Sequence, residues 1–249
     1  MNNRKNKFFK AIKTNDYIYI KYYLKIGLNI NCKNKKGYTG LHEAIFINNI
    51  EMARFLIRNG ILINDMSCHY AAAMGRKEII EILIEYGVDV NVRDYSGRTP
   101  LHWASQEGYV DVVDLLMKNG AQINVQEDDG QTPLYIASAE GHYNVVKQLL
   151  ERGAEVDIPS VFGDTPFCIA CAFENYKEAK LLLKYSANIN YKDSDGRIPL
   201  FYAKIRGDVQ MAKFLIDNGA DINIIDNYGI SISDLDDYEV KNKIYEELY

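Results

Sequence analysis

From residue 97 to residue 229, a glycine recurs every 33 residues along the chain. These glycines open the motifs GRTPLHWA, GQTPLYIA, GDTPFCIA, GRIPLFYA and GISISDLD, at Gly97, Gly130, Gly163, Gly196 and Gly229. An earlier copy, GYTGLHEA, opens at Gly37, and Ala11 lies 33 residues before the motif residue Ala44. A fixed period of about 20 to 50 residues indicates an array in which each repeat packs only on its neighbours. We therefore expect a stacked array without a single central core.

Each repeat carries the signals of two helices. Residues 141–157 place apolar side chains at the i, i+3, i+4 spacing of a helix that is buried along one stripe, at Val145, Val146, Leu149 and Leu150. Thr132 and Pro133 are the preferred residue types for an N-cap and for the first helical position. Gly153 stands where a helix ends in a left-handed residue. The unit is predicted to be helix, turn, helix and a hairpin-like loop such as NVQEDDGQ.

The signatures TPLH-x-A, G-H-x-x-V-V-x-x-L-L and G-A-x-[VI]-N cover residues 5–249 and agree in phase. On these motifs the chain strongly resembles the ankyrin repeat family. The resemblance implies an all-α solenoid of stacked helix-turn-helix pairs with protruding β-hairpin-like loops. It also implies a non-catalytic protein-binding scaffold, which makes its contacts through hairpin tips and first-helix surfaces on the concave side.

Repeat phase predicts one ankyrin-repeat domain, 1–249, with seven helix pairs and a C-terminal remnant. Its parts are an N-terminal capping repeat 1–36, repeats 37–64, 65–91, 92–124, 125–157, 158–190 and 191–223, and a C-terminal cap 224–249. Because the repeats account for the chain, we expect no appended catalytic domain in it.

One repeat is shorter than the others. Gly37 and Gly97 are 60 residues apart, although two periods of 33 would separate them by 66. Alignment assigns the missing six residues to the hairpin tip of the 65–91 unit, so that MSCH at 66–69 occupies the Thr-Pro-Leu-His positions. Cys68 is then a core residue, and Asp65 or Ser67 replaces the threonine cap. The gap is either a notch that admits a partner side chain or a tolerated deletion.

Repeat phase also accounts for the residues that suggest chemistry. His42, His69 and His102 fill the fourth motif position, where the family resemblance implies a hydrogen bond from the imidazole to a neighbouring loop. The CxxC pair Cys168 and Cys171 falls inside a predicted helix, and neither a second CxxC nor a suitably spaced His pair accompanies it. No phosphate-binding glycine motif occurs. We expect no enzyme activity, no catalytic residues, no metal and no cofactor.

Composition and charge narrow the choice of cellular compartment and of partner class. No apolar run approaches the ~18 residues that span a membrane, and the N-terminus lacks the apolar region of a secretory signal. Four cysteines form no disulfide framework, which favours a reducing compartment and a cytoplasmic location. Residues 1–36 hold ten basic residues and one acidic residue, whereas residues 37–249 hold 19 basic and 33 acidic residues. The basic end is either a solvated surface or a docking site for an acidic surface, and the acidic body argues against nucleic acid.

The phase also separates buried positions from presented ones. Presented positions are those around each loop glycine, such as Lys35, Lys36 and Arg197, and those just after the motif alanine. Aromatic and arginine side chains dominate interface energetics. The predicted partner-binding residues are Tyr38, Phe46, Tyr95, Arg98, Gln106, Glu107, Asp129, Val161, Phe162, Phe173, Arg206 and Tyr228. The apolar pair Val161–Phe162 either faces a partner or folds onto a neighbouring loop.

These observations predict a monomeric protein–protein interaction module, acting as an adaptor, scaffold or inhibitor, whose partner is an unidentified protein. Two alternatives remain open. One is an effector of a pathogen or symbiont that acts in the host cytoplasm. The other is a structural protein that self-associates, with the basic start of one copy on the acidic end of another.

Overall fold

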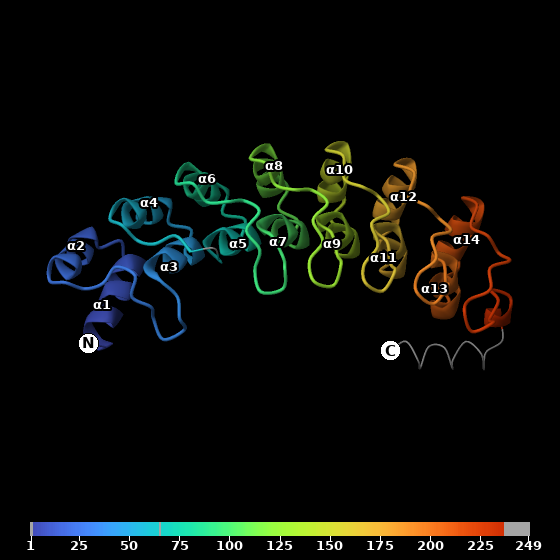
Figure 1. Ribbon diagram of the computed structural model, residues 1–249, viewed down its shortest axis with the longest axis horizontal. Helices are drawn as coiled ribbons and strands as arrows, with labels where there is room; N and C mark the ends of the chain where they lie inside the picture. The colour runs from blue at the N-terminus through green and yellow to red at the C-terminus, as the bar shows by residue number, and fades with distance from the viewer. Residues whose placement is uncertain (1, 65, 237–249) are drawn as a thin grey trace. The chain divides into compact units, whose positions relative to one another are not determined.

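The computed structural model describes residues 2–64 and 66–236, which form fourteen α-helices in seven consecutive pairs (Figure 1). The first helices of the pairs are α1 (Asn2–Lys13), α3 (Gly40–Phe46), α5 (Met66–Ala73), α7 (Pro100–Gln106), α9 (Pro133–Ala139), α11 (Pro166–Ala172) and α13 (Pro199–Arg206). The second helices are α2 (Tyr17–Lys25), α4 (Ile50–Arg58), α6 (Lys77–Glu85), α8 (Val110–Lys118), α10 (Tyr143–Glu151), α12 (Tyr176–Lys184) and α14 (Val209–Asp217).

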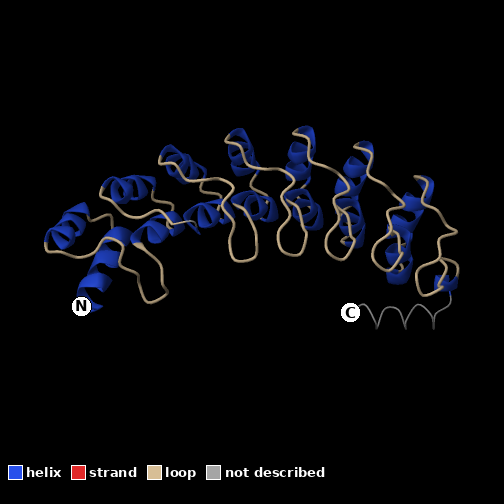
Figure 2. Cartoon of the chain, viewed as in Figure 1, coloured by secondary structure: helices blue, strands red, loops and turns tan. Residues whose placement is uncertain are grey.

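Helices and loops make up nearly all of the described residues (Figure 2). Their only β pairing is an isolated antiparallel bridge between Ile225 and Ser231. The all-α fold class and the seven helix pairs are confirmed. The predicted C-terminal cap reaches the short 3₁₀ helix η1 (Asp234–Asp236), and its remainder, 237–249, lies outside the described residues.

The chain divides into two compact units, Met1–Ala121 and Gln122–Tyr249. In the first unit, α1, α3, α5 and α7 pack successively on one another, and α4, α6 and α8 do the same. In the second unit, α9, α11 and α13 form one such row and α10 packs on α12. Each unit therefore buries its apolar side chains between neighbouring helix pairs. The single continuous domain stays a prediction.

The helices begin and pack as the repeated motif predicts. The Thr132 hydroxyl accepts a hydrogen bond from the N–H of Tyr135, and Pro133 takes the first helical position. The predicted stripe of the second helix is buried at Val145, Val146, Leu149 and Leu150. These apolar side chains supply the main stabilising term for a helix that is too short to be stable alone.

Each hairpin loop is closed by a polar side chain three residues before its glycine. In one loop, Oδ1 of Asp193 accepts hydrogen bonds from the N–H groups of Asp195 and Arg197. The glycines have positive φ, and at Gly163 a Cβ atom would lie 2.6 Å from the nitrogen of Ser194 in the next hairpin. The 33-residue glycine period is therefore required both by the turn and by the close approach of successive loops.

The hairpin that the short repeat lacks is also absent from the structure (Figure 1). Helix α5 begins at Met66, immediately after the segment 61–64, and Cys68 is completely buried. The Ser67 hydroxyl donates a hydrogen bond of 2.8 Å to Oδ1 of Asn64. Ser67 therefore lies within α5 rather than at its N-cap, which corrects one of the two predicted caps; the other, Asp65, lies outside the described residues.

Two of the motif histidines, His42 and His69, connect successive repeats, with one local difference. Nε2 of His69 lies 3.0 Å from the carbonyl oxygen of Arg98 in the following loop, as the family resemblance implied. Nδ1 of His42 accepts a hydrogen bond from the N–H of Thr39, so Nε2 carries the hydrogen and donates to Oδ1 of Asn64 at 2.9 Å. His42 contacts a side chain instead of a loop carbonyl because the loop that would supply the carbonyl is missing.

Candidate protein-binding surface

Four of the predicted apolar and aromatic side chains in the second unit are well exposed. Val161 and Phe162 are 60% and 61% exposed, Phe173 is 59% exposed and Tyr228 is 67% exposed. Asp129 and Arg206 are also exposed. The side chains of Val161 and Phe162 therefore do not fold away onto a neighbouring loop. Exposed apolar groups cost free energy in water, and clusters of them mark interaction surfaces.

The main chain beneath these side chains is firmly held. The N–H of Val161 donates to the carbonyl oxygen of Asp129 at 2.9 Å, and the N–H of Ser194 donates to that of Phe162 at 3.2 Å. The N–H of Asn227 then donates to the carbonyl oxygen of Asp195 at 2.8 Å. These bonds join four successive hairpins of the second unit through main-chain atoms. Tip side chains are thus presented from a preorganised backbone, which lowers the entropic cost of binding.

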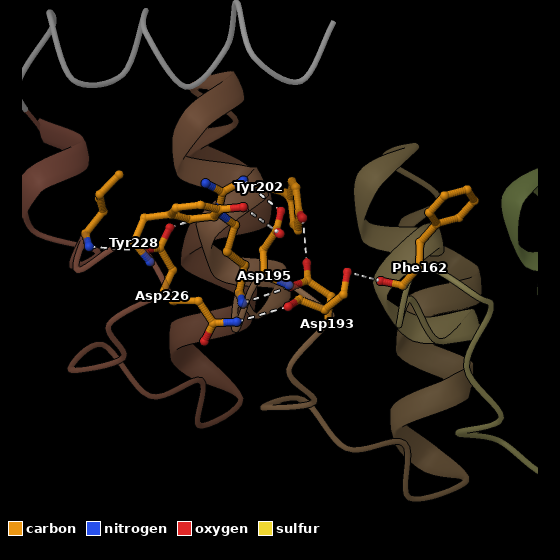
Figure 3. A network of polar contacts seen from close by, with 10 residues as sticks. Phe162, Asp193, Asp195, Tyr202, Asp226 and Tyr228 are labelled. Atoms are coloured by element: carbon orange, nitrogen blue, oxygen red, sulfur yellow. Dashed lines mark hydrogen bonds and ion pairs between the residues drawn. The ribbon is translucent and has the colours of Figure 1, made fainter.

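A polar network fixes the last hairpins (Figure 3). The Tyr202 hydroxyl, on α13, donates a 2.5 Å hydrogen bond to Oδ2 of Asp193. The Tyr228 hydroxyl donates to Oδ1 of Asp195 at 3.2 Å, and the Arg197 guanidinium lies 5.4 Å from the Tyr228 ring. Burial and the adjacent Asp193 carboxylate raise the pKa of Tyr202 far above its usual range, so its hydroxyl stays protonated. The Phe162 ring points away from this network (Figure 3).

Arg197 corrects one prediction made from repeat phase. It was expected at a presented loop position, but only 3% of its surface is exposed. Its Nε donates to Oδ2 of Asp226 at 3.0 Å, and its Nη1 lies 3.4 Å from Oδ2 of Asp195. The two carboxylates from neighbouring hairpins neutralise the guanidinium and draw it inward. Arg197 is therefore part of the support for the surface rather than part of the surface.

A groove of about 310 Å³ runs beside the exposed Phe162 in the second unit. It lies between the hairpin and first helix of one repeat and those of the next, and it contains three predicted residues, Phe162, Phe173 and Arg206. The lining also includes Asp164, Ile169, Asp193, Asp195 and Tyr202. The groove combines aromatic side chains with several carboxylates, a pattern that suits an apolar side chain next to a cationic one.

Asp164 has an altered acidity within this groove. Burial, and to a lesser extent the negative charges of Asp193 and Asp195, together raise the pKa of its carboxyl to about 6. The carboxyl therefore titrates close to neutral pH. A partner cation would favour its ionised form, because an opposite charge nearby stabilises the carboxylate.

The predicted residues of the first unit fall into two groups. Tyr95 is completely exposed at its loop tip, and Glu107 is exposed at the end of α7. Arg98 is half-buried, with Nη1 donating to Oε1 of Gln106 at 2.7 Å and its guanidinium 5.3 Å from the Trp103 ring. These two side chains brace each other beside the exposed Tyr95.

The second group lies next to the missing hairpin. Tyr38 and Phe46 are half-buried, with ring centroids 4.8 Å apart, and both contact Tyr70 of α5, at 5.9 and 5.4 Å. Sequence reasoning missed Tyr70 and Tyr202. Both share the repeat phase of Trp103, whose indole N–H donates to Oδ2 of Asp94. That shared phase was the signal that could have found them.

The residues that suggested other chemistry belong to the core. Cys168 and Cys171 are buried and unpaired, and burial raises the pKa of each thiol, that of Cys168 to about 12. The Thr165 hydroxyl donates to Sγ of Cys168. Within residues 2–64 and 66–236, no group of three or more His, Cys, Asp or Glu side chains is arranged to hold a metal ion. No described helix is long and apolar enough to cross a membrane.

Comparison with known proteins decides the family. The model of ankyrin repeats matches three times, over residues 8–94, 69–160 and 153–226. The chain belongs to the ankyrin repeat family. Its repeats are thus a protein–protein interaction module, and the loop tips and first helices described above belong to that module.

The proteins that resemble this chain differ widely from one another. The chain is 37% identical to the E3 ubiquitin-protein ligase Ufd4 of Drosophila melanogaster over 79 residues, which are 30% of this chain and 3% of that protein. It is 30% identical to the putative ankyrin repeat protein FPV034 of fowlpox virus (strain NVSL) over 99 residues, 39% of this chain and 24% of that protein. It is 36% identical to human Rabankyrin-5 over 81 residues, 25% of this chain and 7% of that protein. The matched regions span less than a quarter of each of these relatives.

Proposed function

We propose that this chain is a non-catalytic binding protein that holds a protein partner on its hairpin tips and first-helix surfaces. The observation that carries the proposal is the exposure of Val161, Phe162 and Phe173 on a backbone that main-chain hydrogen bonds join to the neighbouring hairpins. Apolar side chains presented on a rigid support, with polar groups at their rim, are the usual centre of a protein interface. The partner contributes an apolar side chain to the groove beside Phe162, next to a basic one.

The described histidines and cysteines that suggested catalysis or metal binding serve the repeat structure instead, which supports a role as an adaptor, scaffold or inhibitor. The motif histidines are occupied by hydrogen bonds, and burial, the largest influence, lowers the pKa of His42. The four buried thiols suit a reducing compartment such as the cytosol. Ligase and kinase relatives match this chain only over short repeat segments, so their activities are not transferred to it.

Paired alanine variants test the proposal. One variant carries Phe162→Ala and Phe173→Ala. The matched control carries Tyr143→Ala, at the start of α10, and Tyr185→Ala, at the C-cap of α12, which are exposed aromatic positions away from the hairpin loops. The wild-type protein is used for affinity capture from source cells, and each captured protein is purified and titrated by calorimetry. We expect the loop variant to weaken binding at least ~tenfold and the control to change it by less than ~twofold.

The melting temperature is measured for both variants by circular dichroism. If the loop variant lowered it as far as a core substitution does, Phe162 and Phe173 would be structural residues. If both variants bound the partner as tightly as the wild type, another face of the protein would be the binding surface. Either result would overturn the proposal.

A further inference from the structure

The first unit contains a second groove that differs in charge from the one beside Phe162. It has a volume of about 630 Å³ and lies between α1, the hairpin loop that precedes α3, and α3 itself. Its lining is Asn6, Phe9, Lys10, Lys13, Asn34, Lys35, Lys36, Tyr38, Glu43, Phe46 and Ile47. Four ammonium groups therefore surround a surface of aromatic and aliphatic side chains.

Only one of these four cations is neutralised within the groove. Nζ of Lys13 lies 3.2 Å from Oε2 of Glu43, whose other oxygen accepts a 2.7 Å hydrogen bond from Nδ2 of Asn34. Lys10, Lys35 and Lys36 are exposed and form no ion pair with any residue in the part of the chain that the structure describes. Three like charges around one groove repel one another, and an anionic ligand would relieve that repulsion.

The aromatic side chains of the groove wall are held from the side of α3 that faces away from α1. At Gly163 and Gly130, the backbone of the next hairpin would come within 3 Å of an added Cβ atom. At Gly37 nothing lies within 4 Å, since the next hairpin is the one absent before Met66. Tyr38 and Phe46 line the groove, and their rings contact each other and Tyr70 of α5, which occupies the side where the hairpin is missing.

We propose that this groove binds a short acidic segment of a protein partner, in which carboxylates flank an aromatic or aliphatic side chain. The carboxylates pair with Lys10, Lys35 and Lys36, and the apolar side chain packs on Tyr38, Phe46 and Ile47. The inference rests on the proposed function in taking the loop side of the repeats as the binding face. It adds a binding site in the first unit. This site takes an acidic partner segment, whereas the groove beside Phe162 in the second unit takes a basic side chain.

The groove favours a peptide over a polyanion for two reasons. Glu43 is buried in the groove wall with Oε2 3.2 Å from Nζ of Lys13, and a carboxylate at this place disfavours a continuous row of phosphates. The chain from residue 37 to residue 249 has 14 more acidic than basic residues, so an extended nucleic acid would be repelled beyond the groove. An acidic peptide with an apolar anchor matches both the charge and the aromatic lining.

The test uses the full chain and three synthetic probes. The first is the fluorescein-labelled peptide Glu-Glu-Tyr-Leu-Glu-Glu-Leu, the second is the same peptide with Lys in place of Glu, and the third is a single-stranded RNA of twelve nucleotides. Fluorescence anisotropy at ~50 mM salt is expected to give a Kd below about 0.5 mM for the acidic peptide, weakening as salt rises. The lysine peptide is expected not to bind at this groove.

Charge-matched variants locate the site. Lys10→Glu with Lys36→Glu is expected to weaken acidic-peptide binding at least ~tenfold. The control, Lys25→Glu with Lys184→Glu on α2 and α12, changes net charge equally and is expected to change the Kd by less than ~twofold. Phe46→Ala is expected to weaken binding without removing the salt dependence. The Phe162→Ala, Phe173→Ala variant is expected to bind the acidic peptide normally, so failure of this inference is distinguishable from failure of the proposed function.

Four results would overturn the proposal. The acidic peptide fails to bind at 1 mM, which is about the weakest affinity of interest here. Replacing the control lysines weakens binding of the acidic peptide as much as replacing Lys10 and Lys36. The RNA, or vesicles of phosphatidylserine, bind more tightly than the peptide and depend on the same lysines, which would assign the groove to a polyanion. Light scattering shows a dimer that Lys10→Glu with Lys36→Glu dissociates, which would assign the groove to a second copy of the chain.

Discussion

The Nε atom of Arg197 lies 3.0 Å from Oδ2 of Asp226, in the next hairpin along the chain, and both side chains are nearly inaccessible to water. Removing one member of such a pair leaves the other charge buried without full compensation, which is more costly than never having buried either. This pair therefore makes the last two described hairpins depend on each other.

Replacing Asp226 by Asn should lower the free energy of unfolding by about 3 kcal/mol, since Asp195 remains as a weaker partner for Arg197. Urea denaturation followed by circular dichroism measures the change. Asp217→Asn, at the exposed end of α14, is the control and should change stability by less than about 0.5 kcal/mol. Equal losses of unfolding free energy in the two variants would mean that the buried Asp226 carboxylate contributes no more to stability than the exposed Asp217 carboxylate.

Substitutions at two loop glycines distinguish the free-energy cost of a side chain in a left-handed turn from the cost of crowding the next loop. Gly163 and Gly37 have φ of +87° and +85°, but only Gly163 has the neighbouring loop against it. Gly37→Ala should cost about 1 kcal/mol, because alanine tolerates this conformation poorly. Gly163→Ala should cost about 2 to 4 kcal/mol, because the added methyl group also displaces the backbone at Ser194. The comparison by thermal and urea denaturation would contradict this account if both variants lost the same stability.

Asp164 should make the protein less stable as pH rises through the mildly acidic range. Its pKa is raised to about 6 in the folded chain, chiefly by burial, against about 3.9 for an unfolded aspartate. Between these values the folded state binds more protons than the unfolded state, so the free energy of unfolding falls with increasing pH. Asp164→Asn should be more stable than wild type by about 1 to 3 kcal/mol at pH 7, with the difference vanishing near pH 4.

Urea titrations of both proteins at several pH values measure that difference, in which the titration of all other groups cancels. A difference that stayed constant from pH 4 to pH 7 would show that the Asp164 carboxyl is not perturbed. A more stable wild type at pH 7 would mean that its ionised form is favoured in the folded chain.

The four cysteines should be unreactive in the native protein. Cys32, Cys68, Cys168 and Cys171 are all buried, and burial raises the pKa of each thiol, to about 12 for Cys68 and Cys168. Because the thiolate is the reactive form, labelling with Ellman's reagent at pH 8 should be slow, with fewer than one thiol modified in the first minutes. In ~6 M guanidinium chloride all four should react at once. A fast-reacting native thiol would reveal an exposed cysteine.

Restoring the missing loop tests whether the gap before Met66 has a role. Six residues inserted after Asn64 should place a hairpin beside Gly37, where the structure leaves space. If the gap admits a partner side chain, the new loop should fill it and weaken binding of the captured protein partner at least ~fivefold. Unchanged affinity, with an unchanged melting temperature, would show that the gap is a tolerated deletion.

Much of this architecture was predictable from the sequence because the repeat period reports on packing. The phase of the short repeat placed Cys68 in the core, which is confirmed. It put Met66 at the threonine cap position, whereas α5 already begins at Met66. The period says nothing about where the array divides, so the boundary after Ala121 was not foreseen. The partner-binding residues themselves remain predictions, although most of them prove to be exposed.

The support beneath the candidate surface was harder to predict. Phase fixes where an α-carbon lies, but a long side chain turns toward whatever charge is nearest. Arg197 was therefore expected at the surface, whereas Asp195 and Asp226 hold it inside. The grooves were equally hidden, because each combines residues from two helices and a loop whose proximity depends on three-dimensional packing.

Two of the bonds that join the hairpins of the second unit use main-chain atoms at Val161 and Phe162, so the side chains at these two positions take no part in them. Natural selection can therefore exchange the residues at the tips one at a time while the framework stays the same. A descendant of this protein that has Tyr or Arg where Val161 and Phe162 now stand would keep its stability and acquire another target. Divergence of this surface should accordingly run ahead of divergence in the glycines and threonines that carry it.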